Sequence, residues 1–205
     1  MIYTIGLDPG TISGWAFIAI DATAKVHVMA HGKTGIPGSK GVPTQRTTGG
    51  HIFQVLRQLQ EVAPGAWPPV VVHERQFLPG KADSAHGSER DKAIGAMESQ
   101  VRLGRWLGIA EAMGCPIFKH RDGKEGVPPG VWRADQWGSG RWTTKKAKRT
   151  ALLRAKELWG LEIPRQYHHT AEAVFIGVYG GMKLRERAQL ERQENKETRN
   201  EHKAN

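Results

Sequence analysis

The chain opens with an apolar run that ends in a carboxylate and then turns, Ile5-Gly6-Leu7-Asp8-Pro9-Gly10-Thr11-Ile12-Ser13-Gly14-Trp15. A second apolar run over 15–20 follows at once, so the two runs predict a β-hairpin with Asp8 at the exit of its first strand. Turn chemistry alone would explain this aspartate, because Asp before Pro-Gly often hydrogen-bonds its own backbone. A functional role for Asp8 therefore depends on whether other acids occupy matching positions in the chain.

The length and charge of the chain restrict its class. Its 205 residues suffice for one sizeable core, and we expect one domain over 1–182 followed by a charged tail over 183–205 that is a frayed helix or disordered. The chain has 30 basic residues against 20 acidic ones, a formal net charge of +10. This excess favours a polyanionic partner, either nucleic acid or an anionic membrane surface.

The sequence also predicts where the protein resides. No apolar run approaches the ~18 residues that a membrane span needs, and the N-terminus lacks the pattern of a signal peptide. The single cysteine, Cys115, has no partner for a disulfide and lies beside apolar residues. We expect it to be a small buried side chain in a reducing compartment rather than a nucleophile. The protein should therefore be soluble and cytoplasmic, with no membrane partner.

Hydrophobic periodicity predicts an alternation of strands and helices. The expected strands are the two of the hairpin and the runs 25–30, 69–75 and 114–119, and the expected helices cover 45–63, 89–113, 143–159 and 168–179. Residues 120–142 contain several Gly and Pro residues and read as irregular. This order predicts an α/β fold with a five-stranded mixed sheet flanked by helices.

The helix expected over 89–113 is apolar on more than one face. Its main stripe is Ile94, Met97, Val101, Leu107 and Ala110, with Leu103, Trp106 and Ile109 outside that stripe. A helix that is apolar on several faces needs several partners. Two explanations fit equally well: a homodimer interface, or a helix wedged between the sheet and a loop.

Three further residues are candidates for the same site as Asp8. Glu74 ends an apolar run, at the point where polarity begins, and His169 and Glu172 are three residues apart near the start of the last helix, hence on one face. If the strands that end in Asp8 and Glu74 lie side by side and parallel, both acids reach the edge where open α/β sheets place their sites. Each residue also has an ordinary explanation. Glu74 could be a surface acid, His169 a helix cap, and Glu172 an acid favoured by the helix dipole.

Together the four residues predict a metal site. Mg2+ prefers a few carboxylates and keeps several waters, and two ions ~4 Å apart can clamp the attacking and leaving oxygens of a phosphodiester displacement. One ion would activate water, and the other would stabilise the leaving 3′ oxygen. Histidine can ligate at the edge of such a site or act as a base. We expect two Mg2+ ions per site, with Mn2+ able to substitute, and no small-molecule cofactor.

Basic residues gather in the second half of the chain. Asp135 is the only acid between residues 133 and 154. A solvated helix face is the common explanation of such a run, but its one-sided charge and the flanking Trp137 and Trp142 favour a surface that contacts phosphates. The expected DNA-binding residues are Arg75, Arg133, Arg141, Lys145, Lys146, Lys148 and Arg149.

Four motifs follow one another up to Tyr179. They are Ile5-Gly-Leu-Asp-Pro-Gly-Thr, Val70-Val-Val-His-Glu74, Trp132-Arg133 with the basic cluster 145–149, and His169-Thr-Ala-Glu-Ala-Val-Phe-Ile-Gly. Their order and spacing resemble the RuvC-type Holliday junction resolvases of the ribonuclease H-like superfamily, in particular phage-type members. The resemblance implies a ribonuclease H-like fold with metal ligands at Asp8, Glu74, His169 and Glu172, the last in place of the family's usual Asp.

The same resemblance implies an activity and partners. It implies a magnesium-dependent, structure-selective DNA endonuclease that cuts four-way junctions with paired symmetrical nicks, leaving 5′ phosphates and 3′ hydroxyls. It also implies a homodimer with the helix near 94–113 at or close to the interface. Such a protein would act on branched DNA in the cytoplasm of a bacterium or a phage-infected cell, associated with the nucleoid through DNA.

Three other functions fit part of the sequence. A ribonuclease H-like nuclease acting on RNA–DNA hybrids, flaps or forks would look nearly the same, because recognition of DNA shape leaves no residue-level code. Actin-like ATPases and sugar kinases also begin with Asp-x-Gly-Thr, but they need a second nucleotide-binding half for which 205 residues leave too little chain. A DNA-binding module without catalysis would need only the basic surface, and not four candidate ligands.

Overall fold

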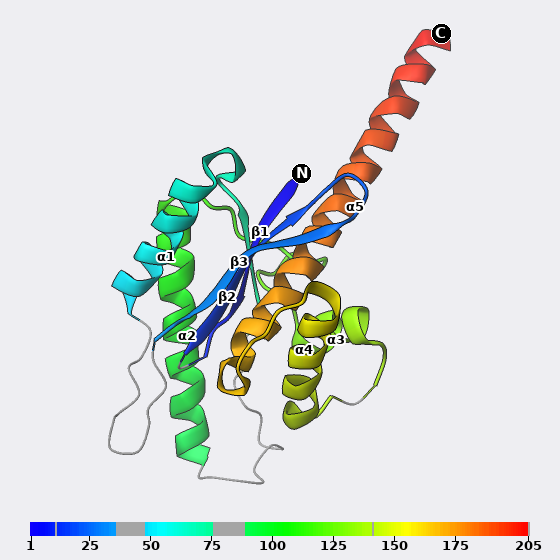
Figure 1. Ribbon diagram of the computed structural model, residues 1–205. Coiled ribbons are helices and arrows are strands. Elements are labelled where there is room, and N and C mark those ends of the chain that lie inside the picture. The colour runs from blue at the N-terminus through cyan, green and yellow to red at the C-terminus, as the bar shows by residue number, and fades with distance from the viewer. Residues whose placement is uncertain (11, 36–47, 76–88, 141, 205) are drawn as a thin grey trace.

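The computed structural model describes residues 1–10, 12–35, 48–75, 89–140 and 142–204, without the side chains of 89–96 and 201–204. Its strands are β1 (Ile2–Asp8), β2 (Ser13–Ile20), β3 (Val26–Thr34) and β4 (Val70–His73), and its helices are α1 (Gly49–Val62), α2 (Glu89–Ala112), α3 (Pro129–Trp137), α4 (Thr144–Trp159) and α5 (His168–Ala204), with short 3-10 turns η1 (Pro64–Ala66) and η3 (Arg165–Tyr167). Figure 1 shows α1 and α2 on one face of the sheet, and α5 with α3 and α4 on the other.

The sheet confirms the mixed α/β architecture. Its strand order is β3-β2-β1-β4. The hairpin and its third strand pair antiparallel, whereas β1 and β4 pair parallel with Leu7 opposite His73. The next residue on each strand is an acid, Asp8 on one and Glu74 on the other. The parallel register therefore brings these two acids to the same edge.

The expected fifth strand over 114–119 is wrong: the described part of the sheet has four strands. The edge of β4 is nevertheless covered at two points. Phe118 donates its backbone N–H to the carbonyl of Val71 at 2.8 Å, and Val127 donates to the carbonyl of His73 at the same distance. Between these contacts the chain leaves the sheet in a loop. Two isolated bridges therefore take the place of one continuous strand.

Side chains of β1 alternate between two cores. Its odd-numbered residues pack with α1 and α2. The even-numbered residues face α5: the Thr4 hydroxyl donates to the Gly177 carbonyl at 2.9 Å, and a side chain at Gly6 would overlap the backbone of α5. Because Asp8 has the same parity as Thr4 and Gly6, its carboxylate leaves the sheet on the α5 side.

The helical layer of α1 and α2 forms the first core. Thr48 caps α1, accepting a hydrogen bond from the backbone N–H of His51, so the helix begins later than the expected residue 45. Over residues 97–112 of α2, whose side chains are described, the buried apolar residues are Leu103, Trp106 and Ala110. Met97 and Val101, which the periodicity placed in the main stripe, are 60% and 54% exposed. The pattern therefore found the helix and placed Leu107 and Ala110 of the main stripe correctly toward the core, but it also placed Met97 and Val101 there.

The second core surrounds α5. Residues 170–181 of this helix are buried all round, because the sheet covers one side and α3 and α4 cover the other. Sequence reasoning missed α3, since Pro128, Pro129 and Gly130 resemble loop punctuation. Its Trp137 is buried and packs edge-on against Phe175 of α5, with ring centroids 5.3 Å apart.

Beyond residue 182 the α5 helix continues to Ala204. Two of its arginines still reach the body: Arg185 donates to the carbonyl of Ala22 at 2.7 Å and Arg187 to that of Lys119 at 2.8 Å. The side chains of 191–200 are all exposed. The division into a domain and a tail stays a prediction. Within the described residues, no helix combines the length and apolar character required to cross a membrane.

Candidate active site

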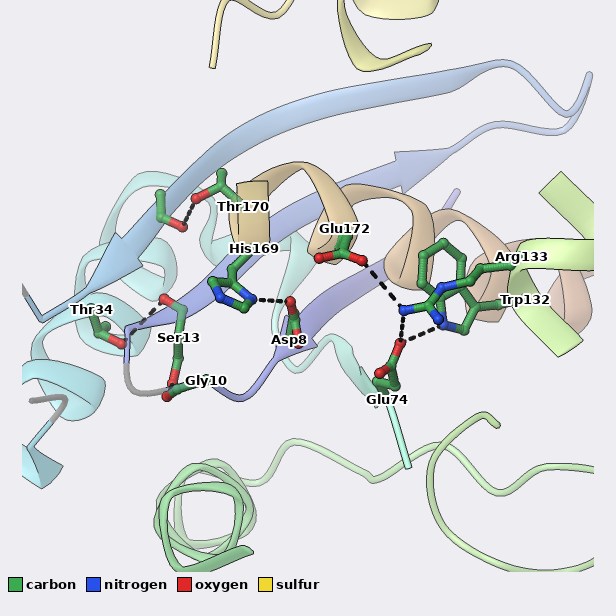
Figure 2. Close-up of polar contacts among 11 residues, drawn as sticks. Asp8, Gly10, Ser13, Thr34, Glu74, Trp132, Arg133, His169, Thr170 and Glu172 are labelled. Atoms are coloured by element: carbon green, nitrogen blue, oxygen red, sulfur yellow. Dashed lines mark hydrogen bonds and ion pairs between the residues drawn. The ribbon is translucent and has the colours of Figure 1, made fainter. Parts of the chain in front are cut away.

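Two carboxylates end the two central strands. The backbone N–H of Glu74 donates to the carbonyl of Leu7 at 3.2 Å, which extends the β1–β4 pairing to the position of Asp8. Both side chains are largely shielded from solvent, with exposed fractions of 12% for Asp8 and 14% for Glu74. Figure 2 shows both carboxylates beneath the first turns of α5.

The first turn of α5 lies directly over the end of β1. His169 Nδ1 is 2.5 Å from Asp8 Oδ2. Gly14, which pairs with Asp8 across the hairpin, makes this approach feasible, because a Cβ at that position would overlap the backbone of His169. Gly14 therefore leaves room for the helix that carries His169 and Glu172.

A second group of contacts joins Glu74 to Glu172. Trp132 Nε1 donates to Glu74 Oε2 at 2.8 Å. Arg133 Nη2 donates to Glu74 Oε2 and to Glu172 Oε1, each at 3.3 Å. Helix α3 thus supplies two adjacent donors that hold an acid from β4, and one of them also reaches an acid from α5 (Figure 2).

The electrostatics show that these acids are crowded. Burial first, and then the Asp8 carboxylate, raise the pKa of Glu74 to about 7 and that of Glu172 to about 9, although Arg133 opposes both shifts. Burial and repulsion between the carboxylates therefore outweigh the single guanidinium at both glutamates. Such a group of desolvated carboxylates gains most from a further cation.

The two histidines at the start of α5 differ in their titration. Burial alone would lower the pKa of His169, but the charge and hydrogen bond of Asp8 raise it above its ordinary value. Burial and the neighbouring His169 lower the pKa of His168 to about 4. His168 is consequently neutral at pH 7, the form in which imidazole binds metals.

The four predicted site residues lie in one cluster, and their roles stay predictions. Arg133, expected to contact DNA, lies inside this cluster with its guanidinium on two carboxylates. Arg75 forms a two-point pair with Asp122 at 2.8 and 3.0 Å, which engages the donors that a phosphate would need. Arg141 lies outside the described residues.

The other expected DNA contacts lie on α4. Lys145, Lys146 and Arg149 are exposed and Lys148 is half-buried. The Lys146 ammonium lies 4.5 Å from the centre of the Trp142 ring. These side chains form a basic face on the helix that packs beside α5.

The donor set suits a divalent cation. Across the described residues, one group of metal-ligating side chains stands out: His168, His169 and Glu172 place donor atoms within 4.8 Å of one another. Asp8 is hydrogen-bonded to His169, and Arg133 forms ion pairs with both Glu172 and Glu74. Carboxylates favour Mg2+ or Mn2+, and imidazole adds affinity for transition metals. Sequence reasoning missed His168, for which the only signal was the adjacent pair of histidines.

Solved structures with the same fold were found. RuvC from Thermus thermophilus matches with a TM-score of 0.52 and 19% identity, over 86% of this chain and 92% of that one. RuvC of T. thermophilus in complex with a Holliday junction substrate matches with a TM-score of 0.53 and 18% identity, over 86% and 91%. The yeast mitochondrial Holliday junction resolvase Ydc2 aligns with a TM-score of 0.46 and 18% identity, over 95% and 84%. No protein-family model and no curated protein matches. The chain therefore has the RuvC fold, as the ribonuclease H-like prediction required.

Proposed function

We propose that this protein is a divalent-metal-dependent endonuclease that resolves four-way (Holliday) DNA junctions by hydrolysing phosphodiester bonds. The observation that carries the proposal is the convergence of Asp8, Glu74, His169 and Glu172 at one sheet edge. The RuvC fold supports it, as does the Holliday junction bound to T. thermophilus RuvC. The +10 net charge suits a DNA substrate.

Asp8, Glu74, His169 and Glu172 are the residues that we assign as metal ligands. The pKa values of Glu74 and Glu172 are raised, which fits such a role, because a bound cation would stabilise the ionised carboxylates. Two Mg2+ ions, or Mn2+ in their place, would supply activation of water and stabilisation of charge on the leaving oxygen. Both glutamates would then hold their charge at neutral pH.

The chain's own residues position these groups. Asp8 fixes the ring of His169 by accepting a hydrogen bond from its Nδ1–H. Trp132 and Arg133 fix the Glu74 carboxylate through two donors to the same oxygen. Hydrolysis would leave a 5′ phosphate and a 3′ hydroxyl, and Arg133 offers a fixed positive charge close to the reacting phosphate.

The basic face of α4 provides the proposed contacts to the DNA backbone through Lys145, Lys146, Lys148 and Arg149. Paired symmetrical nicks need two active sites, which a homodimer would supply. The exposed apolar residues Met97 and Val101 on α2 are the proposed dimer contacts. With DNA as its substrate, the protein would act in the cytoplasm of a bacterium or phage-infected cell.

The direct experiment compares three labelled substrates: a four-way junction, a linear duplex of the same sequence, and an RNA–DNA hybrid. We expect Mg2+-dependent paired nicks in the junction and little cleavage of the other two. Asp8→Asn serves as the inactive control. Preferential cutting of the hybrid would replace the resolvase assignment by a ribonuclease H activity.

A further inference from the structure

A cavity of about 480 Å3 adjoins the candidate active site. It lies between α4 and the turn η3 that leads into α5, and its wall carries four cations and no acid among its described residues. Three of the cations, Lys145, Lys148 and Arg149, come from α4, and the fourth, Arg165, comes from η3. The cavity therefore favours an anion.

Apart from His168, the rest of the wall is aliphatic. It consists of Leu152 and Leu153 of α4 and Ile163 of the following segment. Contacts with DNA phosphates require only cations. If DNA bound here through its phosphates alone, the aliphatic part of the wall would have no partner. A ligand that uses both parts of this wall carries a phosphate next to a flat, weakly polar group. A nucleotide has that composition, and its size falls within the range of pockets for small ligands.

His168 links the cavity to the acid cluster. It lines the cavity, its ring centre is 4.0 Å from that of His169, and its donor atom lies within 4.8 Å of those of His169 and Glu172. Lys148, also on the wall, is close enough for its charge to act on both His169 and Glu172. The cavity is thus one side chain away from the proposed reaction centre.

We infer that this cavity receives the nucleotide adjacent to the scissile phosphate, with its base unstacked against Leu152, Leu153 and Ile163 and its phosphate among Lys145, Arg149 and Arg165. The inference rests on the proposed function and deepens it, because it assigns a site for one unstacked base beside the scissile phosphate. Unstacking a base costs less free energy where stacking is already interrupted, as at a branch point, than within a continuous duplex. The pocket would accordingly favour branched DNA over linear duplex.

The test places 2-aminopurine, whose fluorescence rises when it leaves the base stack, at each position flanking the cut in a four-way junction. The protein carries Asp8→Asn so that the junction stays intact. We expect fluorescence to rise at least ~3-fold at one position, consistent with full extrusion of a base. Leu153→Ala should remove most of this rise. Leu158→Ala is the matched control, because Leu158 lies on the same helix, is 55% exposed against 51% for Leu153, and lies outside the cavity wall.

A second pair of variants tests the phosphate contact. Arg165→Gln should lower the slope of log affinity against log salt by about one unit. Arg154→Gln, on the exposed side of α4 and outside the cavity wall, should leave the slope unchanged.

The outcomes separate the two proposals. If wild-type protein neither binds nor cuts four-way junctions, the proposed function fails and the nucleotide pocket fails with it. If it cuts junctions, yet no position brightens or Leu153→Ala behaves like Leu158→Ala, the pocket alone is refuted. An unchanged salt slope for Arg165→Gln would likewise remove the phosphate from this cavity.

Discussion

His169 Nδ1 and Asp8 Oδ2 are 2.5 Å apart although their positions in the chain differ by 161. This contact joins the first turn of α5 to the end of β1. Glu172 lies on the same helix, and Glu74 follows β4, the strand that pairs with β1. Both residues are also proposed ligands, so the hydrogen bond holds the pair in position before a cation arrives.

Asp8→Asn should abolish cleavage while preserving junction binding. The amide keeps the shape of the side chain and loses the charge that a divalent cation requires. We expect cleavage to fall by at least ~100-fold, in line with the loss of a metal-site group, and junction affinity to stay equal or rise because one repulsive carboxylate is gone. Cleavage rates and gel-shift titrations measure the two effects. Normal cutting by this variant would show that the site lies elsewhere.

Arg133→Gln should weaken the metal-free fold. Its guanidinium bridges Glu74 and Glu172, and the loss of hydrogen bonds to charged groups costs ~2 kcal/mol. Urea unfolding in the presence of a chelator measures this change, and Arg154→Gln is the control on an exposed position. We expect Mg2+ to recover part of the loss, since a cation can take over the charge of the guanidinium. Equal stability of the two variants would contradict the bridging role.

Glu172→Gln should change how stability depends on pH. The pKa of Glu172 rises from 4.5 to about 9 on folding, so below pH 4.5 the residue is protonated in both states and the variant resembles the wild type. As the pH rises toward 9, Glu172 ionises in the unfolded wild-type chain but stays protonated in the folded one. The free energy of unfolding of the wild type therefore falls. The variant cannot ionise and escapes this loss.

Thermal unfolding in chelator at pH 5, 7 and 9 checks the prediction. The melting temperature of Glu172→Gln should exceed that of the wild type by a margin that grows with pH, reaching ~4 °C or more, which corresponds to ~1–2 kcal/mol for a chain of this size. Mg2+ at pH 9 should close the gap by stabilising the wild type alone. A constant margin would mean that Glu172 is ionised throughout.

Gly14→Ala should destabilise the protein by ~3 kcal/mol, the range for an overpacked core. The added methyl group would overlap the backbone of His169 and Thr170. Gly104→Ala provides the opposite control: nothing lies within 4 Å of a Cβ there, and Ala in place of a helical Gly stabilises by ~0.5–1 kcal/mol. Chemical denaturation of both variants gives the comparison. A neutral effect of Gly14→Ala would show that α5 can move away from the hairpin.

Val101→Glu should convert the proposed dimer into a monomer. Val101 is 54% exposed on α2, and an apolar dimer contact does not tolerate a buried unpaired charge. Val62→Glu, at a residue of α1 that is 75% exposed, should leave the assembly intact. Sedimentation measures the mass of each variant, and junction cutting by the monomer should lose its paired symmetry. A monomeric wild type would remove α2 from any interface.

The sequence was most informative where a single strand or helix determines the outcome. The strand ends predicted Asp8 and Glu74, and the spacing of three predicted His169 and Glu172, because these patterns depend on local geometry. The bridge made by Arg133 could not be foreseen, since it depends on how α3 packs against β4 and α5. The same limit applies to which face of α2 is exposed and to how the edge of β4 is covered, because both depend on contacts with segments distant in the chain.

The close approach of α5 to β1 has a consequence for tolerance to substitution. At Gly6 the helix meets the sheet through main-chain atoms, close to the Ala173 carbonyl and the backbone of Gly177. Main chain has no rotamers to exchange, so the spacing between β1 and α5 is insensitive to the volume of apolar side chains elsewhere. Conservative repacking of either core should therefore lower the melting temperature well before it alters the turnover rate.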